Sequence, residues 1–457
     1  MDITLGEIAE VLGAQLCCDG STRIKGVSID SRTLKKGMLF FALRGDNYDG
    51  HSFLGEVFEK GAVGAVVDGE KISSNKYGNA EILLKVVDPL RALQDVASYY
   101  RRKFNIPVIS VTGTNGKTTT KEMIAAVLST RYRVVKSPGN LNNHIGVALS
   151  ICNWNRNEEC AVVEMGTNHF GEIRRLCEIA RPTHGLITNI GKGHLEFFGN
   201  EEGVVKAKSE LLQFLDDKGK AFLNGDDQYL FPLKDRVSDT VTYGFSDRCD
   251  IRGYDLGVDE SGFPSMKIGE EKIKIFIPGR HNLINGLAAA AVGRSFEISW
   301  EDIRDSLESY RPMKKRMEIV ESSGIMIIND TYNANPVSVH HALSTLSDIK
   351  KIKRRIVVLG DMLELGKSSE VEHRKIGELI SDLGIDIFFS YGTEMKAASK
   401  RAKELGVNVV EHFDSKAELA TRLQQIIKPD DGILVKGSRG MRMEEVVEML
   451  QREKSQE

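Results

Sequence analysis

Short runs of β-branched and other apolar residues alternate with helical stretches along most of the chain. Strands are predicted at residues 27–29, 39–43, 65–67, 107–111, 161–163, 185–188, 325–328, 356–359, 387–389 and 433–435. Apolar residues at i, i+3, i+4 spacing predict a helix from Asp88 to Phe104, which Pro89 would open. Alternation of this kind indicates α/β layers with mostly parallel sheets.

Length and two changes in this pattern predict three domains, because 457 residues are too many for one hydrophobic core. The helix at 88–104 would connect the first domain to the second, and the basic, proline-broken stretch Arg311–Arg316 marks the second boundary. We expect a small mixed α/β domain at residues 1–87, a central P-loop α/β domain at 88–313 and a Rossmann-like α/β domain at 314–457.

Composition narrows the class of partner. The net charge is −3, with 41% hydrophobic and 28% charged residues, so nothing favours a nucleic-acid binder. The N-terminus does not resemble a signal peptide, and no apolar run approaches the roughly 18 residues that span a bilayer. The six cysteines form no C-x-x-C pair and no zinc spacing. Scattered thiols fit a reducing compartment, so we expect a cytoplasmic protein without membrane insertion.

The strongest local signal for chemistry is the segment Ser110–Thr120, between a predicted strand and a helix predicted at 121–129. Glycines let backbone N–H groups approach phosphate oxygens, and a helix N-terminus adds a positive dipole end. Lys117 would contact the β- and γ-phosphates, and the Thr118 hydroxyl would bind Mg²⁺. The candidate nucleotide-binding residues are Gly113, Thr114, Asn115, Gly116, Lys117, Thr118 and Thr119.

This loop departs from the general pattern G-x-x-x-x-G-K-[ST], which would place the first glycine at Val111 rather than at Gly113. The alternative interpretation is a Gly/Thr-rich turn with a surface lysine. The order strand, loop, lysine, hydroxyl and helix favours phosphate binding.

Other candidate residues follow later strands. Glu164 ends the strand at 161–163, and an acid at the carboxyl end of a parallel strand beside a phosphate loop can reach Mg²⁺. His194 follows another strand, and Lys206 and Lys208 lie in a helical stretch. Taken alone, Glu164 could face solvent, His194 could be structural, and the two lysines could form a solvated helix face.

The shortened loop resembles the loop shared by Mur ligases and folylpolyglutamate synthetases. The resemblance extends to Glu164-Met165-Gly166 and to His194-Leu195-Glu196. It implies an ATP-dependent amide ligase with Mg²⁺ held by Thr118, Glu164 and His194. It also implies that Lys208, rather than Lys206, is carbamylated and serves as a further metal ligand. Lys117, His194 and Lys208 are therefore the expected catalytic residues.

The same resemblance assigns roles to later residues. Residues 279–286 are similar to the family's His-Asn-x-x-Asn element, which implies that Asn282 and Asn285 contact adenine. The alternative is simple capping before an alanine-rich helix predicted at 287–292. Arg316 and Asp330 resemble groups that reach ATP from the third domain when it closes.

Segments in each of the three predicted domains favour Mur ligases that act on late muramoyl peptides. Ser31, Arg32 and Arg44 lie in segments that resemble the UDP-binding region, and the arginine fork suits a diphosphate. Residues 137–146 resemble a loop that contacts the muramoyl sugar, although asparagines are also common turn residues. Its candidate residues are Asn140, Asn142 and Asn143.

Residues 358–366 and 435–444 resemble members of the family that add D-alanyl-D-alanine, and the Asp-Asn-Pro-Arg element of the diaminopimelate-adding members is absent. The resemblance implies a monomeric enzyme of peptidoglycan synthesis that joins D-alanyl-D-alanine to UDP-N-acetylmuramoyl-tripeptide through an acyl phosphate. One rival is a folylpolyglutamate-type ligase, which has no use for a UDP-binding domain. Another is a non-catalytic ATP-binding regulator, which would not need Glu164, His194 and Lys208 together.

Overall fold

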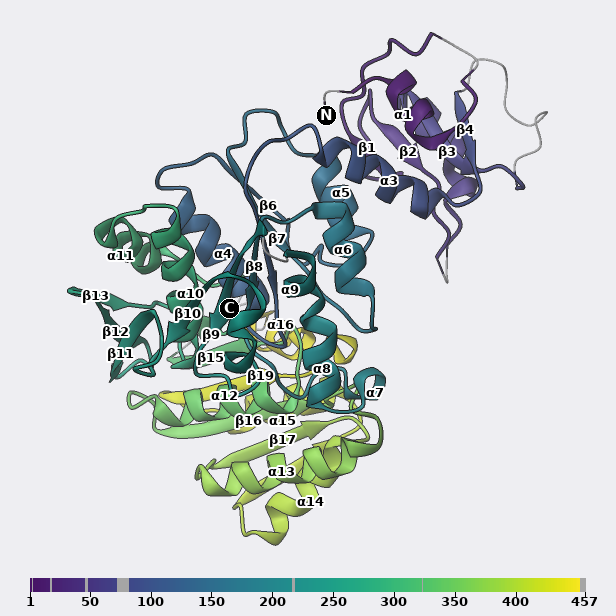
Figure 1. The fold of residues 1–457 in the computed structure, drawn as a ribbon. Helices are drawn as coiled ribbons and strands as arrows, with labels where there is room; N and C mark the ends of the chain where they lie inside the picture. The colour runs from purple at the N-terminus through teal and green to yellow at the C-terminus, as the bar shows by residue number, and fades with distance from the viewer. Residues whose placement is uncertain are drawn as a thin grey trace.

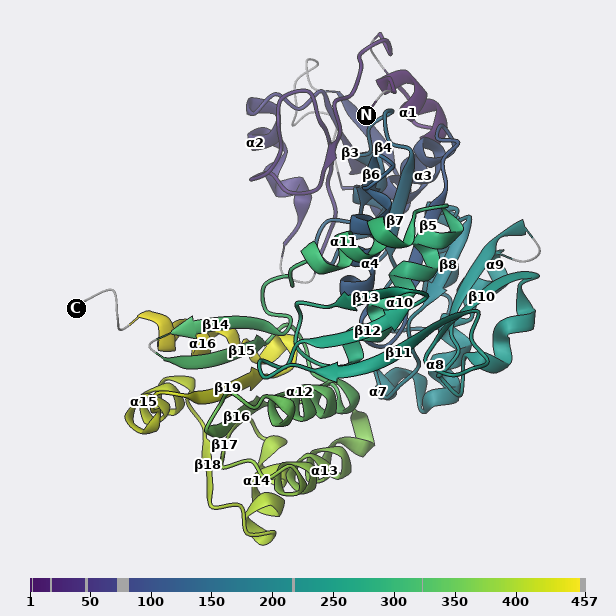
Figure 2. The ribbon, with the colours of Figure 1, turned by 90° about the vertical axis from the view of Figure 1, so that its left-hand side faces the viewer.

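Three β-sheets follow one another along the chain. The computed structural model describes residues 1, 3–16, 19–45, 48–71, 82–215, 218–322 and 324–452. Figures 1 and 2 show the N-terminal region at one end of the molecule, the C-terminal region at the other and the central region between them. Among the described residues, no helix is long and apolar enough to cross a membrane.

The N-terminal region has one parallel sheet of four strands in the order β1-β2-β3-β4. Its elements are α1 (Leu5–Leu12), β1 (Val27–Ser28), β2 (Leu39–Phe41), a 3₁₀ turn at Gly50–Phe53, α2 (Leu54–Glu59), β3 (Gly64–Asp68) and β4 (Leu83–Val86). Strands β2 and β3 are almost wholly buried, as their apolar runs predict.

Helix α3 (Pro89–Arg101) confirms the predicted helix after residue 88 and fixes the N-terminal region to the central one. Asp88 caps the helix by accepting a hydrogen bond from the Leu90 N–H at 2.8 Å, and the proline occupies its first turn. The buried Tyr100 hydroxyl donates to the Trp154 carbonyl at 2.9 Å, and Arg101 Nε donates to the Ala180 carbonyl at 2.8 Å. These buried bonds cross from one region to the next.

The central region has a sheet of nine strands in the order β13-β12-β11-β10-β9-β8-β5-β7-β6, parallel except for the pairs β11–β12 and β12–β13. Its strands are β5 (Val108–Thr112), β6 (Val134–Lys136), β7 (Cys160–Glu164), β8 (His184–Ile187), β9 (Lys220–Asn224), β10 (Asp239–Gly244), β11 (Ile251–Val258), β12 (Pro264–Ile268) and β13 (Glu271–Lys274). The antiparallel strands β11, β12 and β13 at one edge of this sheet were not predicted. They mix polar and apolar residues, as strands of an exposed hairpin do.

Helices cover this sheet on both faces (Figure 1). They are α4 (Lys117–Leu128), α5 (Gly146–Cys152), α6 (Glu172–Ala180), α7 (Leu195–Phe198), α8 (Glu201–Lys208), α9 (Glu210–Leu215), α10 (His281–Ser295) and α11 (Trp300–Ser309), with a 3₁₀ turn at Phe231–Arg236. Two helices begin earlier than predicted, α4 by four residues and α10 by six. In α10 the early residues Asn282, Asn285 and Gly286 are buried, and packing against α4 overrides their low helix propensity.

The C-terminal region has a six-stranded sheet in the order β14-β15-β19-β16-β17-β18, parallel except for β14 against β15. Its elements are β14 (Glu318–Ser322), β15 (Ile325–Asp330), α12 (Pro336–Asp348), β16 (Arg354–Gly360), α13 (Ser369–Asp382), β17 (Ile387–Tyr391), α14 (Met395–Glu404), β18 (Val409–Phe413), α15 (Lys416–Ile426), β19 (Asp431–Lys436) and α16 (Glu444–Arg452), with 3₁₀ turns at Gly366–Ser368 and Arg439–Met441. The predicted three-part α/β fold is confirmed, and the domain bounds stay a prediction.

One buried apolar cluster joins the central and C-terminal regions. It contains Met123 and Leu287 of the central helices α4 and α10 together with Leu343 of α12 and Leu434 of β19. A shared core of this kind holds two sheets in a fixed relation. The polar residues at their common edge therefore have defined neighbours.

Candidate active site

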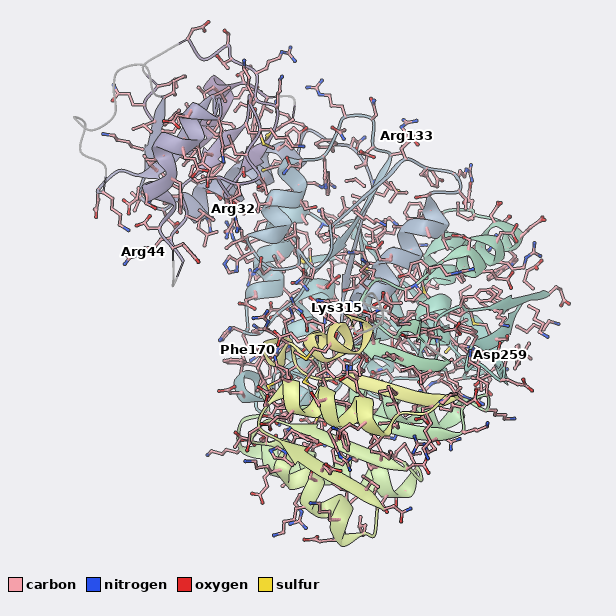
Figure 3. The ribbon with its side chains drawn as sticks, turned by 180° about the vertical axis from the view of Figure 1, so that it is seen from behind. Arg32, Arg44, Arg133, Phe170, Asp259 and Lys315 are labelled. Atoms are coloured by element: carbon pink, nitrogen blue, oxygen red, sulfur yellow. The ribbon has the colours of Figure 1, made fainter. Side chains whose placement is uncertain are left out.

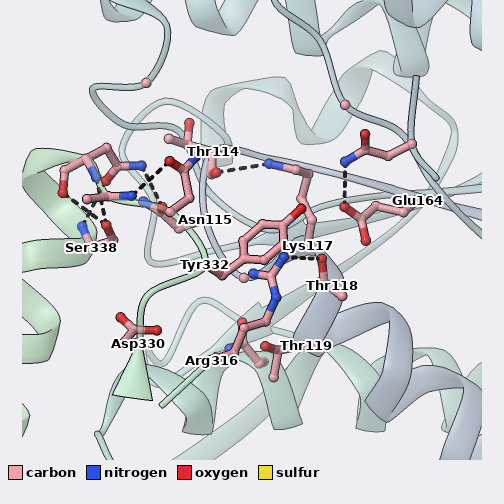
Figure 4. A pocket seen from close by; sticks show the side chains of 18 of the residues that line it. Thr114, Asn115, Lys117, Thr118, Thr119, Glu164, Arg316, Asp330, Tyr332 and Ser338 are labelled. Carbon is pink, nitrogen blue, oxygen red and sulfur yellow. Dashed lines mark hydrogen bonds between the residues drawn. The ribbon is translucent and has the colours of Figure 1, made fainter. Parts of the chain in front are cut away.

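A cavity of about 450 Å³ lies where the carboxyl ends of β5 and β7 meet the C-terminal region. It gathers predicted site residues that are up to 216 positions apart in the sequence, from 114 to 330. Those that line it are Thr114, Asn115, Gly116, Lys117, Thr118, Thr119, Asn142, Asn143, Glu164, His194, Asn282, Asn285, Arg316 and Asp330. Figure 4 shows this pocket from close by.

The loop before α4 needs both of its glycines. Gly113 has φ 143°, and a Cβ there would lie 1.9 Å from the Thr188 hydroxyl oxygen. Gly116 has φ 77°, and a Cβ there would lie 2.5 Å from Asn285 Oδ1. Gly116 is also the N-cap of α4 and offers no side-chain cap, so the first amides of the helix are available to an anion. The predicted phosphate cradle therefore has the backbone that the chemistry requires.

The segment after β8 braces this loop. The Asn115 carbonyl accepts hydrogen bonds from the Thr188 hydroxyl at 2.6 Å and from Asn189 Nδ2 at 3.0 Å. The Asn115 N–H donates to Asn189 Oδ1 at 2.9 Å. A loop held by three bonds from a neighbouring strand end is organised before any ligand binds, which lowers the entropy cost of binding.

The Lys117 ammonium lies over its own loop, as Figure 4 shows. It donates to the Gly113 carbonyl at 2.8 Å and to the Thr114 carbonyl at 3.0 Å. Burial lowers its pKa, Arg316 lowers it further, and the Glu164 carboxylate opposes both effects. A cation at this point is well placed to donate hydrogen bonds to phosphate oxygens.

Glu164 is the last residue of β7 and is 1% exposed, which excludes the solvent-facing alternative. Its Oε1 accepts a hydrogen bond from Asn142 Nδ2 at 2.8 Å. Its Oε2 is buried and has no hydrogen-bond partner among the residues that the structure describes, although Lys121 Nζ lies 3.8 Å away. A buried carboxylate oxygen without a hydrogen-bond partner fits a divalent cation.

The rest of the donor set is sparse. The described part of the chain has no group of three or more His, Cys, Asp or Glu side chains placed to hold a metal. Glu164 and the buried Thr118 hydroxyl would therefore contribute only part of a coordination shell. This suits Mg²⁺, which is commonly held by one or two protein groups together with water and phosphate oxygens.

His194 lines the cavity and meets the C-terminal region. It is the N-cap of α7 with φ 55°, and its Nδ1 lies 2.6 Å from Glu364 Oε2. This contact lowers the pKa of Glu364. The Glu196 N–H donates to the Glu364 carbonyl at 3.2 Å, so the two segments touch twice. The role of His194 as a metal ligand stays a prediction.

The two lysines of α8 have different surroundings. Lys208 is 2% exposed and does not line the cavity, and burial lowers the pKa of its amine well below the ordinary value, with Lys117 adding to the effect. Lys206 instead lies 5.4 Å from the centre of the Phe170 ring. A solvated helix face is therefore wrong for Lys208.

Arg316 reaches the phosphate loop from the connection between the two regions. Its Nη2 donates to the Thr118 hydroxyl at 2.9 Å, and its guanidinium stacks 3.7 Å from the centre of the Tyr332 ring. Its neighbours Lys315 and Met317 both have left-handed backbone, with φ 66° and 50°. Such residues cost about 1–3 kcal/mol each, and the surrounding contacts must hold them.

Asp330 closes this wall of the cavity at the end of β15. Its Oδ1 accepts the Met317 N–H at 3.1 Å, and its Oδ2 is paired with the buried Lys436 ammonium. Lys436 also donates to the Asn333 carbonyl at 2.8 Å. Asp330 thus fixes the chain next to Arg316 and lines the cavity at the same time.

Several residues of the cavity were not predicted. Tyr332 and Asn335 follow Asp330 closely in the sequence, and Lys436 lies within residues 435–444, so proximity to predicted residues could have indicated them. Asn335 Nδ2 donates to Asn115 Oδ1 at 2.8 Å and so joins the C-terminal region to the phosphate loop. His341 carries no such signal, because only docking of α12 brings its ring 5.1 Å from that of His281.

Asn282 and Asn285 line the cavity but already have protein partners. Asn285 Nδ2 donates to Asn282 Oδ1 at 3.0 Å, and Asn285 Oδ1 accepts from the Thr120 hydroxyl at 3.1 Å. Asn282 Nδ2 donates to the Pro278 carbonyl at 2.9 Å. These bonds connect α10 to α4 beneath the phosphate loop, and adenine contact by the two residues stays a prediction.

The remaining predicted substrate residues lie outside the cavity. Figure 3 shows Arg32 and Arg44 on the N-terminal region, apart from Lys315 at the edge of the C-terminal one. Arg32 is paired with Asp30 at 2.7 Å and its side chain is 85% exposed. Ser31 is buried, and Asn140 is exposed. Of the predicted substrate residues, the cavity therefore collects only Asn142 and Asn143.

A second hollow of about 310 Å³ adjoins the cavity on the side of the N-terminal region. Residues that line both are Asn143, His144, Gly166 and Glu172. The second hollow continues to the exposed ring of Phe170 and to Gln94 on α3. The two hollows together run from the phosphate loop toward the N-terminal sheet.

Comparison with known proteins matches all three regions to one family. Residues 23–101 match the model described as Mur ligase family, catalytic domain. Residues 111–293 match the Mur ligase middle domain, and residues 315–439 match the Mur ligase, glutamate ligase domain.

Whole-length relatives agree with these matches. The UDP-N-acetylmuramoyl-tripeptide–D-alanyl-D-alanine ligase of Bacillus subtilis (strain 168) is 39% identical over 454 residues, which cover 98% of each chain. A MurF structure from Acinetobacter baumannii is 30% identical with a TM-score of 0.87, and covers 98% of this chain and 99% of its own. A MurF ligase structure from Thermotoga maritima, in complex with ADP, is 27% identical with a TM-score of 0.82, over 94% of this chain and 98% of its own.

Proposed function

This chain belongs to the Mur ligase family, and we propose that it uses ATP to join D-alanyl-D-alanine to the terminal carboxylate of UDP-N-acetylmuramoyl-tripeptide. The product would be the UDP-linked muramoyl pentapeptide of peptidoglycan synthesis, with ADP and phosphate. The observation that carries the proposal is the single cavity in which a phosphate loop, a buried acid and groups from the C-terminal region meet. The similarity to D-alanyl-D-alanine ligases over 98% of the chain supports this substrate pair.

The phosphate chain of ATP would lie on the loop from Gly113 to Thr119, with its γ-phosphate beside Lys117 and Arg316. Both side chains are cations held by neighbouring protein groups, the first by loop carbonyls and the second by Thr118 and Tyr332. Charges fixed before the reaction stabilise a transferring phosphoryl group without reorganisation. The Thermotoga maritima relative, solved in complex with ADP, supports nucleotide binding by this fold.

Mg²⁺ fits beside this loop because Glu164 Oε2 is buried without a hydrogen-bond partner in the described part of the chain and Thr118 lines the same cavity. A bound Mg²⁺ would neutralise charge on the phosphate oxygens. Glu164 and Thr118 would hold it, with His194 as a further candidate ligand.

The reaction would proceed in two covalent steps. The tripeptide carboxylate attacks the γ-phosphorus, the bond from that phosphorus to the bridging oxygen breaks, and ADP leaves. The free amine of D-alanyl-D-alanine then attacks the acyl carbon, loses a proton and expels phosphate through a tetrahedral intermediate. Contacts such as Asn335 with Asn115 hold the C-terminal region over the cavity, which would keep water from the acyl phosphate.

The muramoyl peptide would enter along the second hollow. That hollow shares Asn143 and His144 with the nucleotide cavity and extends toward α3 and the N-terminal region. Arg32 and Arg44 would bind the UDP moiety on that region, at a distance from the reacting carboxylate. Asn140 and Asn142 would contribute to the sugar-binding loop.

We also propose that Lys208 is carbamylated. Reaction with CO₂ requires an uncharged amine, and burial together with the nearby Lys117 lowers the pKa of Lys208 in this direction. Carbamylation would turn this uncharged amine into an anion with two oxygen ligands, which is attracted to the nearby Lys117 cation and suits a hard metal ion. As part of the proposed function, we also infer that the protein is cytoplasmic and monomeric.

The test is phosphate release from ATP with UDP-muramoyl-tripeptide, measured with and without D-alanyl-D-alanine. Sustained turnover is expected only when both substrates are present. Equal turnover with a folate and glutamate would replace this assignment by the folylpolyglutamate-type ligase. If the protein binds ATP but shows no turnover in all of these conditions, the non-catalytic regulator is favoured.

A further inference from the structure

One fully buried cation has no role in the reaction described so far. Lys121 lies one turn after Lys117 on α4 and is 0% exposed. Burying an ammonium is costly unless other groups replace its water, so its partners indicate what it does. Those partners belong to three separate parts of the structure.

The first part is the loop that carries the asparagines, residues 137–143, here called the asparagine loop. Lys121 Nζ donates to the Ser137 carbonyl and to the Gly139 carbonyl, each at 2.8 Å. These carbonyls lie at the start of the loop, before Asn142 and Asn143 reach the cavity. The ammonium therefore ties this loop to the phosphate-loop helix.

The second part is Glu164. Lys121 Nζ lies 3.8 Å from its Oε2, and the other carboxylate oxygen accepts from Asn142 at 2.8 Å. The Glu164 N–H also donates to the Ser137 hydroxyl at 3.2 Å. Lys121 thus lies within ion-pair distance of the carboxylate and also holds the loop whose Asn142 bonds the carboxylate's other oxygen.

The third part is Glu122, whose Oε1 lies 3.0 Å from Lys121 Nζ. Glu122 is also paired with Lys136 on β6 and does not line either hollow. This ion pair balances the buried charge but does not face the reacting groups. It therefore provides a comparison for a purely structural role.

We propose that Lys121 is a positioning residue that fixes the asparagine loop and the Glu164 carboxylate on the helix of the phosphate loop. It thereby holds the binding place of the muramoyl peptide in register with that of ATP. The inference rests on the proposed function for the identity of this peptide substrate. The link itself, from α4 to the loop and to Glu164, stands on the contacts alone.

The test compares Lys121→Met, Lys121→Gln and Glu122→Gln in the full-length protein. Lys121→Met should lower kcat/KM for UDP-muramoyl-tripeptide by about 30-fold or more, while KM for ATP changes less than about threefold. Amide hydrogen exchange in residues 137–143 should become at least about tenfold faster without any substrate present. Lys121→Gln keeps donors but not the charge, so its effects should be intermediate. Glu122→Gln should stay within about threefold of wild type throughout.

A double substitution sharpens the result. If Lys121 acts through Asn142 and Glu164, then Lys121→Met combined with Asn142→Ala should lower kcat/KM by less than the product of the two single effects. Independent effects that multiply would overturn the proposal. So would equal kinetics and equal exchange in Lys121→Met and Glu122→Gln, because the ammonium would then act only as a structural brace.

Two further outcomes are decided by the same data. If Lys121→Met does not fold, the test uses the kinetics and amide hydrogen exchange of Lys121→Gln. Exchange of residues 137–143 at the wild-type rate in Lys121→Gln would then overturn the inference. If the wild-type protein shows no turnover with both substrates, the proposed function fails. The exchange comparison still decides the positioning role in that case, because it needs no substrate.

Discussion

The two walls of the cavity differ in how they are built. The phosphate-loop wall comes from one continuous segment, Gly113–Thr119, whose glycines, lysine and hydroxyl are neighbours in the sequence. The opposite wall is assembled from Arg316, Asp330 and His341, which belong to a connection, a strand and a helix. The first wall is local, and the second exists only when the C-terminal region is docked.

This difference predicts different consequences of substitution. The loop is held by the neighbouring strand end through Thr188 and Asn189, so it keeps its shape whatever the C-terminal region does. The opposite wall is held by contacts across the boundary, such as Arg316 with Thr118 and Glu364 with His194. Chemistry is therefore expected to depend on the first wall, and nucleotide retention and water exclusion on the second.

The largest effect is expected at the phosphate loop. Lys117→Ala should lower kcat by about 10²–10³-fold or more at saturating ATP, because it would remove the cation proposed to lie beside the γ-phosphate. Its hydrogen bonds go only to carbonyls of its own loop, so the thermal unfolding midpoint should change little. Turnover and thermal unfolding are measured on the same preparation. Near wild-type turnover at saturating ATP would place the γ-phosphate elsewhere.

The next effect separates two neighbouring lysines of α8. Lys208→Ala should lower turnover by about 10²-fold, without rescue by bicarbonate and with partial rescue by a short carboxylic acid. Lys206→Ala is the matched control and should retain most activity, because Lys206 lies over the Phe170 ring. A carbamate signal from ¹³CO₂-treated wild type, lost in Lys208→Ala, provides a direct readout. Similar, small losses in both variants would contradict the carbamate.

A smaller effect is expected on the opposite wall. Asp330→Ala should raise KM for ATP by about tenfold, because it releases Lys436 and the Met317 N–H and so loosens the chain beside Arg316. Initial rates over a range of ATP concentrations measure this change. Asp382→Ala, at the exposed end of α13 in the C-terminal region and outside the cavity, is the control. Unchanged ATP dependence in Asp330→Ala would mean that this wall does not bind nucleotide.

The smallest effect is expected on the pH dependence of stability, through His281 of α10 and His341 of α12, which stack where the central and C-terminal regions meet. Burial lowers the pKa of His281 to about 3, with His341 adding, and lowers that of His341 to about 4, with His340 adding. Above about pH 6.5 both rings are neutral whether folded or unfolded, so they add no pH dependence. As pH falls from about 6.5 toward 4, only the unfolded or undocked chain takes up these protons. The free energy of unfolding therefore falls, by about 1.4 kcal/mol per ring at pH 5.5.

Thermal unfolding at pH 7.5 and 5.5 tests this sign. His341→Gln should show a smaller fall in midpoint than wild type, because one of the two proton uptakes is removed. His169→Gln is the control, since its side chain is 62% exposed. An equal fall in wild type and His341→Gln would show that the pair does not govern the acid sensitivity of the interface.

Sequence by itself determined the parts of the site whose chemistry is local. The phosphate loop could be predicted because strand, glycines, lysine and helix must be adjacent to form a cradle. Glu164 could be predicted because it ends a strand that pairs with β5, and the carboxyl ends of parallel strands share one edge of a sheet. The α/β class followed from the alternation of strands and helices for the same reason of local pattern.

Tertiary structure decided what depends on packing between distant segments. The early start of α10, the burial of Lys208 and the stacking of His281 on His341 all arise from contacts that no spacing specifies. Lys121 is the clearest case, because in the sequence it is one more polar residue on a helix, whereas in the fold it is wholly buried between a loop and a carboxylate. Burial changes the energy of a charge by far more than its neighbours along the chain do, and only the folded chain determines burial.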